Sequence, residues 1–388
     1  MPCSISMDDM NAPINTARLA VVDESISMAH DLVDYYYLPD VLAIGHMYVK
    51  AGMVDGGGLS KKRVLAYGGY PDEPYSGISN GDYFKKAMVR ANGVVENFEQ
   101  GVDKAVFTNL EGKDLMDPQF LTEEVEHSWY NYPDGTKSLH PSEGITKPNY
   151  TGPKTGTKEH WEFLDETKKY SWIKSPTFQG KACEVGPLAK YIVVYTKVKQ
   201  GIIKNPTWAE ALMVKQVDTV SSVLGVPAHV WMCSTVGRTA CRALDAQVAA
   251  SLSQYFFDKL VSNIKGGDTV VANTEKFDPN TWPKEAKGVG VLDAPRGGLG
   301  HWCVIKDGKI DNYQCIVPTT WNACPKTIAN EHGAYESNMI DTKVKIADKP
   351  LEILKGIHSF DPCLACSTHL YNKKGEEIVS VNTDALCK

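Results

Sequence analysis

Residues 234–267 read STVGRTACRALDAQVAASLSQYFFDKLVSNIKGG. Apolar side chains recur along this stretch every four positions, at Leu244, Val248, Leu252, Phe256, Leu260 and Ile264. This spacing predicts one long amphipathic helix. Ser234 can cap its beginning, and Gly266-Gly267 would end it. At about 1.5 Å per residue the helix would be a rod of roughly 45 Å, long enough to organise a helical core.

Helical patterns also lie elsewhere along the chain. Apolar residues at spacings of three and four predict a helix over 16–37, which Pro39 would end. Another helix is expected over 188–198, and a further one would begin at Asn205 and stop at Gly225. The second half of the chain is therefore expected to be built on two or three long helices.

Strand signals are short and local. Residues 301–306 and 309–317 are β-rich runs joined by Asp307-Gly308, and this combination predicts a hairpin. Residues 51–180 are rich in Gly, Pro, Asn and Asp without sustained periodicity, which indicates long loops and short strands. The predicted fold class is α+β and mainly helical, with a long helix bundle as the core and with small β-hairpins and long irregular loops.

Composition excludes several classes of protein. The 388 residues include 41 Lys and Arg against 47 Asp and Glu, a net charge of −6, which argues against a nucleic-acid binder. Ten cysteines in a chain of this length are too sparse for a disulfide-stapled scaffold. The longest apolar runs fall far short of the roughly 20 residues of a membrane span. The sequence thus predicts a folded protein with no transmembrane segment of its own.

The stretch that carries chemistry is Asp361-Pro362-Cys363-Leu364-Ala365-Cys366-Ser367-Thr368-His369. Two thiols three residues apart can bind one metal ion, and thiolates suit nickel, zinc, copper(I) or iron. The alternatives are a redox pair, half of a structural zinc site, or two buried core cysteines. The sequence has no second C-x-x-C pair, which weakens the interpretation as half of a structural zinc site. A redox C-x-x-C pair usually lies at the beginning of a helix, whereas this pair follows a short helix expected at about 350–357. This position weakens the redox interpretation.

This stretch resembles the C-terminal signature of the large subunit of nickel-iron hydrogenases, which bear a nickel-iron centre. Five other runs agree with that family: PDVLAIG at 39–45, YSWIKSP at 170–176, EVGPL at 184–188, APRG at 294–297 and VPTTWN at 317–322. The resemblance extends from near Met1 to beyond His369. It implies the hydrogenase large-subunit fold, with residues 1–369 as the C-terminal part of one large domain.

The resemblance also implies a role for each residue of the signature. Cys363 would be the terminal nickel thiolate, and Cys366 would bridge nickel and iron. The iron would carry carbon monoxide and cyanide ligands. His369 would bind a nearby Mg²⁺ or second iron ion, sharing it with the backbone carbonyl of Cys315. Taken alone, Cys315 could equally be an ordinary strand residue.

Arg296 would lie over the open face of the metal pair, held by the carboxylate of Asp361 and with Pro295 beside it. Heterolytic cleavage of H2 releases a proton and therefore needs a base. A guanidinium is almost never neutral, so a thiolate such as that of Cys363 is the more economical base. Arg296 would then act as an electrostatic clamp. Taken alone, Arg296 could be a surface residue and Asp361 a turn cap.

The sequence departs from the family in two places. The N-terminal Arg-x-Cys-Gly-x-Cys signature, which supplies two further thiolates in the family, is absent, and Cys3 lies in a different context. The chain therefore resembles the C-terminal two-thirds of a large subunit, and we expect it to be inactive alone. Residues 370–388 would be the extension that is removed on maturation. His301, His229 and Glu184 are interpreted as structural.

The resulting hypothesis is the large, catalytic subunit of a nickel-iron uptake hydrogenase, an oxidoreductase that cleaves or forms H2. No cysteine run resembles an iron–sulfur cluster site, so electrons would pass to an iron–sulfur small subunit. A maturation protease and nickel-insertion factors would be further partners. The form of the signature is most similar to exported enzymes, which implies the periplasmic face of the membrane, with the cytoplasm as the alternative. The competing hypothesis is a truncated chain or maturation intermediate that binds no metal.

Overall fold

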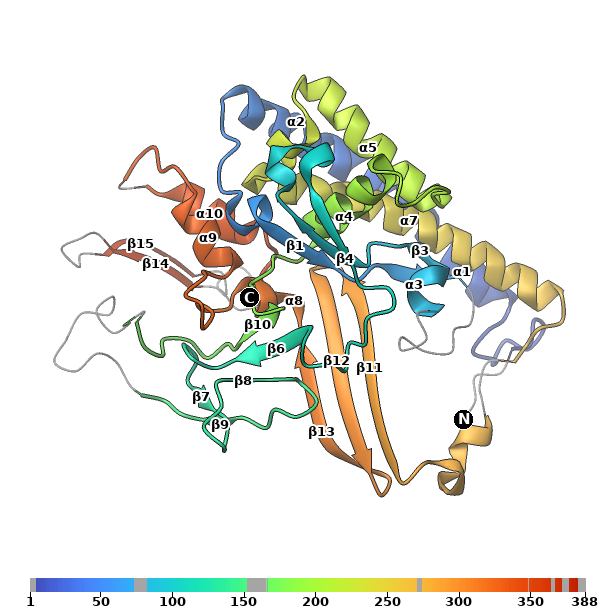
Figure 1. Cartoon of the computed structure of the whole chain (residues 1–388). Coiled ribbons are helices and arrows are strands. Elements are labelled where there is room, and N and C mark those ends of the chain that lie inside the picture. The colour runs from blue at the N-terminus through green and yellow to red at the C-terminus, as the bar shows by residue number, and fades with distance from the viewer. Residues whose placement is uncertain are drawn as a thin grey trace.

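The computed structural model describes residues 5–72, 82–151, 165, 167–270, 274–347, 349–363, 367–371 and 377–382. The longer helices gather at the top of Figure 1, and small antiparallel sheets lie below them. The helices are α1 Thr16–Leu32, α2 Leu38–Lys50, α3 Asp82–Lys86, α4 Pro187–Lys199, α5 Trp208–Leu224, α6 Ala228–Met232, α7 Thr235–Lys265, α8 Pro318–Asn322, α9 Ala334–Ile340 and α10 Leu351–His358. The predicted α+β class is confirmed.

The strands form sheets of two or three members in the described part of the chain, and every pairing is antiparallel. The three-stranded sheets are β1 Arg63–Ala66, β4 Gly93–Glu96 and β5 Val106–Asn109; β10 Ser175–Phe178, β6 Leu121–Glu124 and β8 Ser138–Leu139; and β11 Glu285–Ala294, β12 Gly297–Lys306 and β13 Lys309–Ile316. The pairs are β2 Gly69–Pro71 with β3 Ala87–Val89, β7 Tyr130–Asn131 with β9 Lys147–Pro148, and β14 Ser367–Tyr371 with β15 Glu377–Asn382.

The long helix α7 is the centre of the helical layer. The side chain of Ser234 accepts a hydrogen bond from the backbone N–H of Gly237 and so caps the helix as predicted. Leu244, Val248 and Leu252 are buried in one hydrophobic core together with side chains of α4 and α5. Both of these helices pack against α7. The apolar spacing of the sequence therefore predicted the face that α7 buries as far as Leu252. Beyond it the prediction is wrong in part, because Phe256 is only partly buried and Leu260 is 38% exposed.

The beginning of α5 differs from the prediction. The helix was expected to begin at Asn205, but its N-cap is Thr207. The Thr207 hydroxyl accepts from the Glu210 N–H at 3.1 Å, and the Glu210 carboxylate accepts from the Thr207 N–H at 2.9 Å. This reciprocal pair satisfies two N–H groups at the helix end, which Asn205 could not do from two residues upstream.

The prediction that Pro39 ends the first helix is wrong. A π-helical turn, η1 (Val33–Tyr37), joins α1 directly to α2, and Pro39 lies in the first turn of α2. The N–H of Leu38 donates to the carbonyl of Val33, five residues back. Proline has no N–H to donate and its ring needs room next to the preceding turn, which the wider π turn gives. The chain is therefore helical from 16 to 50.

The predicted hairpin at Asp307-Gly308 is confirmed. Both residues have positive φ, at 48° and 72°, as the two-residue turn between right-twisted strands requires. The sheet of β11, β12 and β13 extends downward from the helical layer in Figure 1. The other end of β12 pairs with β11 through a second tight turn at residues 295 and 296, because Ala294 lies opposite Gly297. The predicted short helix near 350–357 corresponds to α10.

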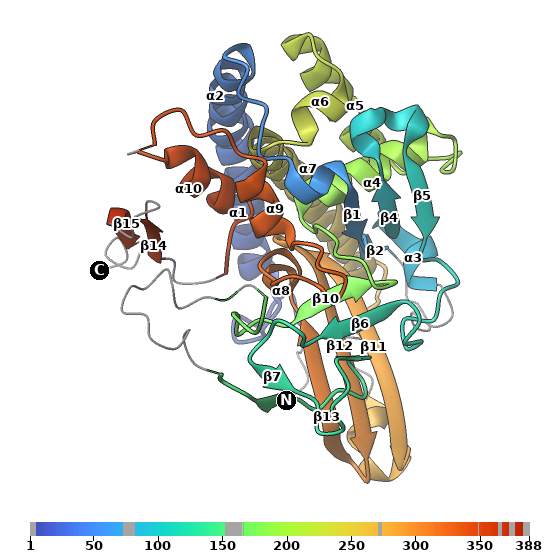
Figure 2. The same cartoon turned by 60° about the vertical axis from the view of Figure 1, so that its left-hand side comes forward.

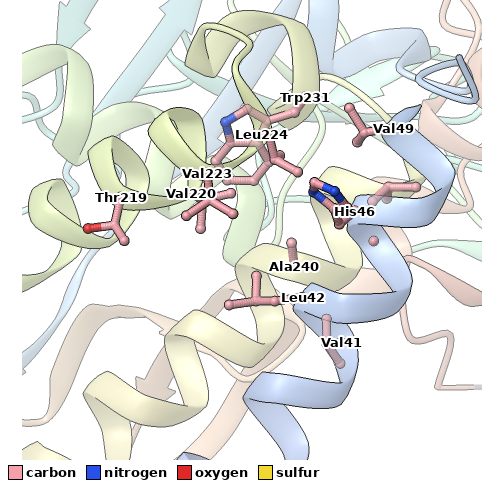
Figure 3. Close-up of a pocket in the computed structure, with 12 residues that line it drawn as sticks. Val41, Leu42, His46, Val49, Thr219, Val220, Val223, Leu224, Trp231 and Ala240 are labelled. Atoms are coloured by element: carbon pink, nitrogen blue, oxygen red, sulfur yellow. The ribbon is translucent and has the colours of Figure 1, made fainter. Parts of the chain in front are cut away.

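A small apolar cavity lies between α2 and the helices α5, α6 and α7. Its volume is about 70 Å³, and its lining includes Leu42, Val220, Leu224 and Trp231. In Figure 3 the ring of His46 points from α2 toward Leu224 and Trp231. The Nδ1 atom of His46 is buried and has no hydrogen-bond partner among the described residues. This nitrogen is a local cost to folding.

Replacing His46 with phenylalanine is expected to raise the free energy of unfolding by about 1–2 kcal/mol, because it removes an unsatisfied nitrogen and fills part of the cavity. Urea unfolding followed by circular dichroism measures the change. His46→Gln keeps a polar group at this position and should gain nothing. A loss of stability in His46→Phe would show that the imidazole is satisfied in solution.

Candidate functional site

Arg296 is positioned by the turn between β11 and β12. Pro295 and Arg296 are the two residues of this turn, and Gly297 follows them with φ 123°. A Cβ atom at Gly297 would lie 2.4 Å from the backbone nitrogen of Gly186, so only glycine fits there. The turn therefore packs directly on the backbone of residues 185–186, which belong to another of the family-like runs.

Asp361 lies just after α10 and faces this turn. Its N–H donates to the carbonyl of His358 at 2.9 Å, and its φ of 55° turns the chain sharply after the helix. The Nε atom of Arg296 donates to the backbone carbonyl of Asp361 at 2.9 Å and lies 3.3 Å from the carboxylate Oδ2. The fold thus brings together a guanidinium and a carboxylate that are 65 residues apart in sequence.

Cys363 follows two residues later and is exposed. Its N–H donates to the Oγ1 atom of Thr319 in α8 at 3.3 Å. The next turn of α8 carries Asn322, whose side-chain amide bonds both the N–H and the carbonyl of Val185, at 3.0 and 2.9 Å. In both views α8 lies close to the upper end of β12. Four family-like runs therefore meet around Cys363.

The other predicted thiolate and the predicted histidine cannot be placed in the same way. The side chains of Cys366 and His369 lie outside the described residues, although the backbone of 367–371 forms β14. Among the side chains that are described, no group of three or more His, Cys, Asp or Glu is arranged to hold a metal ion. The ligand roles of Cys363, Cys366 and His369 stay predictions.

A buried arginine that sequence analysis missed supports this region from α7. Arg238 pairs with Glu184 through two contacts of 2.7 and 2.9 Å and donates to the carbonyls of Gly56 and Gly57, both at 2.7 Å. Its guanidinium carbon lies 4.0 Å from the centre of the Phe360 ring. Arg238 and Glu184 are 3% and 1% exposed, so solvent does not screen the pair. Glu184 fits the structural interpretation made from the sequence.

Cys315 lines a polar cavity of about 290 Å³. Its backbone carbonyl has a hydrogen-bond partner next to it in the chain. The Gln314 amide donates to this carbonyl at 3.1 Å and to Glu123 at 3.3 Å. Lys174 donates to the other carboxylate oxygen of Glu123 at 2.6 Å. Burial raises the pKa of Glu123, and Lys174 opposes that shift. Sequence analysis assigned no role to these three side chains, although Lys174 lies within the run YSWIKSP.

The turn that carries Arg296 is anchored at its base by Asp293. This buried carboxylate accepts from the backbone N–H groups of Tyr67 at 3.2 Å and Gly68 at 2.8 Å. Burial raises the pKa of Asp293 from its usual value of 3.8 to about 6, with the nearby Lys190 acting in the opposite direction. Lys190 itself is held by an ion pair of 2.7 Å with Asp245.

The raised pKa of Asp293 predicts a pH dependence of stability. Between about pH 4 and pH 6 the folded protein holds a proton on Asp293 that the unfolded chain has lost, so stability from this group falls as pH rises through that window. Relative to Asp293→Asn, the wild type should lose about 3 kcal/mol of unfolding free energy across this range. Chemical unfolding at a series of pH values measures this difference. Asp258→Asn, at an exposed position, should show no such window; a flat Asp293 difference contradicts the prediction.

Comparisons with known proteins support the family resemblance. The model of the family described as "Nickel-dependent hydrogenase" matches residues 1–369. The chain is 44% identical over 384 residues to the "Hydrogenase-1 large chain" of Escherichia coli (strain K12) and 46% identical over 385 residues to the "Uptake hydrogenase large subunit" of Rhizobium leguminosarum bv. viciae. Each alignment covers 98% of this chain and 60% of the relative.

A solved structure is similar as well. The Ni-Fe-Se hydrogenase from D. vulgaris Hildenborough in the reduced state superposes with a TM-score of 0.65 at 27% identity, covering 90% of this chain and 60% of that one. This likeness confirms the expected hydrogenase large-subunit fold. Within the described residues, no helix is long and apolar enough to cross a membrane. With a family match over residues 1–369 and relatives above 40% identity, this chain belongs to the nickel-dependent hydrogenase family.

Proposed function

We propose that this chain is the part of an uptake hydrogenase large subunit that binds a nickel-iron centre, and that the assembled enzyme cleaves H2 into protons and electrons. The observation that carries this proposal is the contact of Arg296 with Asp361, two residues before Cys363. Relatives that are named uptake hydrogenase large subunits support it. The chain spans 60% of the length of these relatives.

The donor set fits such a centre. Cys363 is a free thiol at the surface, and soft thiolate ligands suit nickel and iron. Cys363 would bind nickel, and Cys366 would bridge nickel to an iron that carries carbon monoxide and cyanide. When bound, the centre would supply the site where H2 is polarised. The chain brings two of the four thiolates that the family uses, so residues 1–388 alone should be inactive.

The side chains around Cys363 have separate tasks. The sulfur of Cys363 would accept the proton that H2 releases. Asp361 holds the Nε atom of Arg296, and within the described residues the guanidinium makes no other hydrogen bond. Its terminal nitrogens would therefore be available to stabilise negative charge that develops during the reaction. Pro295 fixes the backbone conformation of the turn before Arg296.

A second metal ion would lie near Cys315. The carbonyl of Cys315 and the ring of His369 would share Mg²⁺ or Fe²⁺. Oxygen donors are the ligands that Mg²⁺ prefers, and the cavity that Cys315 lines is also lined by Glu123. The polar cavity supports this part of the proposal.

The proposed assembly includes an iron–sulfur small subunit that accepts the electrons. A maturation protease would remove residues 370–388 after nickel-insertion factors had acted. The enzyme would associate with the membrane on its periplasmic face through the small subunit. The names of the relatives, which are large chains or large subunits, support the existence of a smaller partner.

The test is hydrogen-dependent reduction of a dye by purified protein. We expect activity when this chain is co-expressed with its small subunit and with a segment that carries the family's Arg-x-Cys-Gly-x-Cys signature. Residues 1–388 alone should show none. An assembled complex that contains nickel and iron but consumes no H2 would overturn the proposed activity, and H2 consumption by residues 1–388 alone would overturn the expected inactivity.

A further inference from the structure

Two arginines of α7 hold the segment that leads into Cys363. Arg238 and Arg242 lie one helical turn apart. Arg238 contacts the ring of Phe360 from 4.0 Å. Arg242 donates from Nη1 to the backbone carbonyl of Ser359 at 2.8 Å. Helix α7 therefore contacts the backbone of Ser359 and the side chain of Phe360 from two successive turns.

Arg242 also reaches the carboxylate of Asp361. Its Nε atom lies 4.0 Å from Oδ2 of Asp361, and the same oxygen lies 3.3 Å from Nε of Arg296. One carboxylate oxygen is thus placed between two guanidinium groups. The Nε atom of Arg242 is buried and has no hydrogen-bond partner among the described residues. Burial lowers the pKa of Arg242, and Asp361 is the largest opposing influence.

The carboxylate of Asp361 contributes to the orientation of Arg296 beside the hydrogen bond from Nε to the backbone carbonyl of Asp361. The side chain of Arg296 is 40% exposed, and that of Asp361 is 39% exposed. A half-exposed carboxylate with a single partner can rotate into water, since surface ion pairs are weak. The Nε atom of Arg242, which is buried in a side chain that is 21% exposed, lies on the other side and favours the rotamer in which Asp361 also faces Arg296. The two arginines are therefore coupled through Asp361.

We propose that Arg242 is a positioning residue of the metal site: it holds the carboxylate of Asp361 and through it the guanidinium of Arg296 beside Cys363. This inference deepens the proposed function and rests on it for its role in catalysis. Arg242 contacts neither H2 nor metal in this account and acts through Asp361. A residue that only anchored the Ser359 carbonyl would act on Arg296 through the backbone, and its removal would add to the effect of Asp361→Asn.

The decisive measurement is the rate at which phenylglyoxal modifies Arg296, read by peptide mass spectrometry on purified residues 1–388 without metal. Arg242→Met and Asp361→Asn should each raise this rate by about three- to tenfold, within the range of coupling between contacting groups. The double variant should be no faster than Asp361→Asn alone. Arg242→Lys keeps the cation without the planar fork and should lie between Arg242→Met and the wild type. Exposed Arg18 on α1 is the internal control, and its rate should not change.

An Arg296 rate in Arg242→Met equal to the wild-type rate, or additive effects in the double variant, would overturn the proposal. If Arg242→Met does not fold, Arg242→Lys decides by the same criterion, a faster rate at Arg296 with an unchanged rate at Arg18. In the assembled enzyme, Arg242→Met should lower kcat by about tenfold while KM and nickel content stay unchanged. An assembled complex without nickel would contradict the proposed function but would not change the rates at which Arg296 is modified in residues 1–388. Failure of the proposed function and failure of the proposed role of Arg242 are therefore distinguishable.

Discussion

Replacing Arg238 with methionine should lower the free energy of unfolding of this chain by about 3–5 kcal/mol. The substitution leaves the carboxylate of Glu184 buried without its partner, and it removes the donors to the carbonyls of Gly56 and Gly57. It also removes the cation over the ring of Phe360. Because these groups are almost fully buried, water cannot replace the lost contacts. Denaturant titration followed by tryptophan fluorescence measures the loss.

Two variants control this prediction. Arg238→Met combined with Glu184→Gln should recover part of the stability, since the double variant has no unpaired buried charge. Arg18→Met, at the exposed end of α1, should change stability by less than about 0.5 kcal/mol. An Arg238→Met protein as stable as the wild type would mean that the buried pair is not formed.

Replacing Arg296 with lysine should lower hydrogen oxidation by the assembled enzyme by about 10²–10³-fold, the cost of losing one preorganised donor at a reacting centre. The Nε atom of Arg296 donates to Asp361, and the rest of the guanidinium is then held in one orientation. Lysine keeps the positive charge but has a single nitrogen. This nitrogen cannot bond Asp361 and face the metal centre at the same time, as the guanidinium can. Steady-state dye reduction measures the loss, with nickel content determined on the same samples.

The matched control is Lys306→Met, at the far end of the strand β12 that begins after Arg296. Lys306 pairs with Asp311 at the surface, so its removal should leave the rate within about twofold. Arg296→Lys enzyme with wild-type activity and wild-type nickel content would remove Arg296 from the reaction.

Local patterns predicted the elements that depend on local physics. The apolar spacing of α7 and the Asp307-Gly308 turn each follow from steric and burial rules that operate within a few residues. The two errors also have local causes. Pro39 is accommodated by a π turn, which single-residue rules do not anticipate, and Thr207 is a better cap than Asn205 because Glu210 completes the capping box.

The site could not be predicted from local patterns. The contact of Arg296 with Asp361 joins residues 65 positions apart, and only the family resemblance linked them. Arg238, Arg242 and Glu123 were missed because charged residues are ordinarily at the surface. In this fold Arg238 and Glu123 are buried and Arg242 is 21% exposed, and all three bond partners that lie far away in the sequence, which local patterns do not reveal.

Elemental analysis of the assembled large subunit shows whether the thiols of Cys363 and Cys366 hold nickel. We predict nickel and iron together in the wild-type protein and the loss of nickel in the Cys363→Ser and Cys366→Ser variants, with the Arg296→Lys variant still loaded. Wild-type protein without nickel in the presence of all partners, or full nickel occupancy in a protein that carries both serine substitutions, would contradict the claim that these thiols hold the metal.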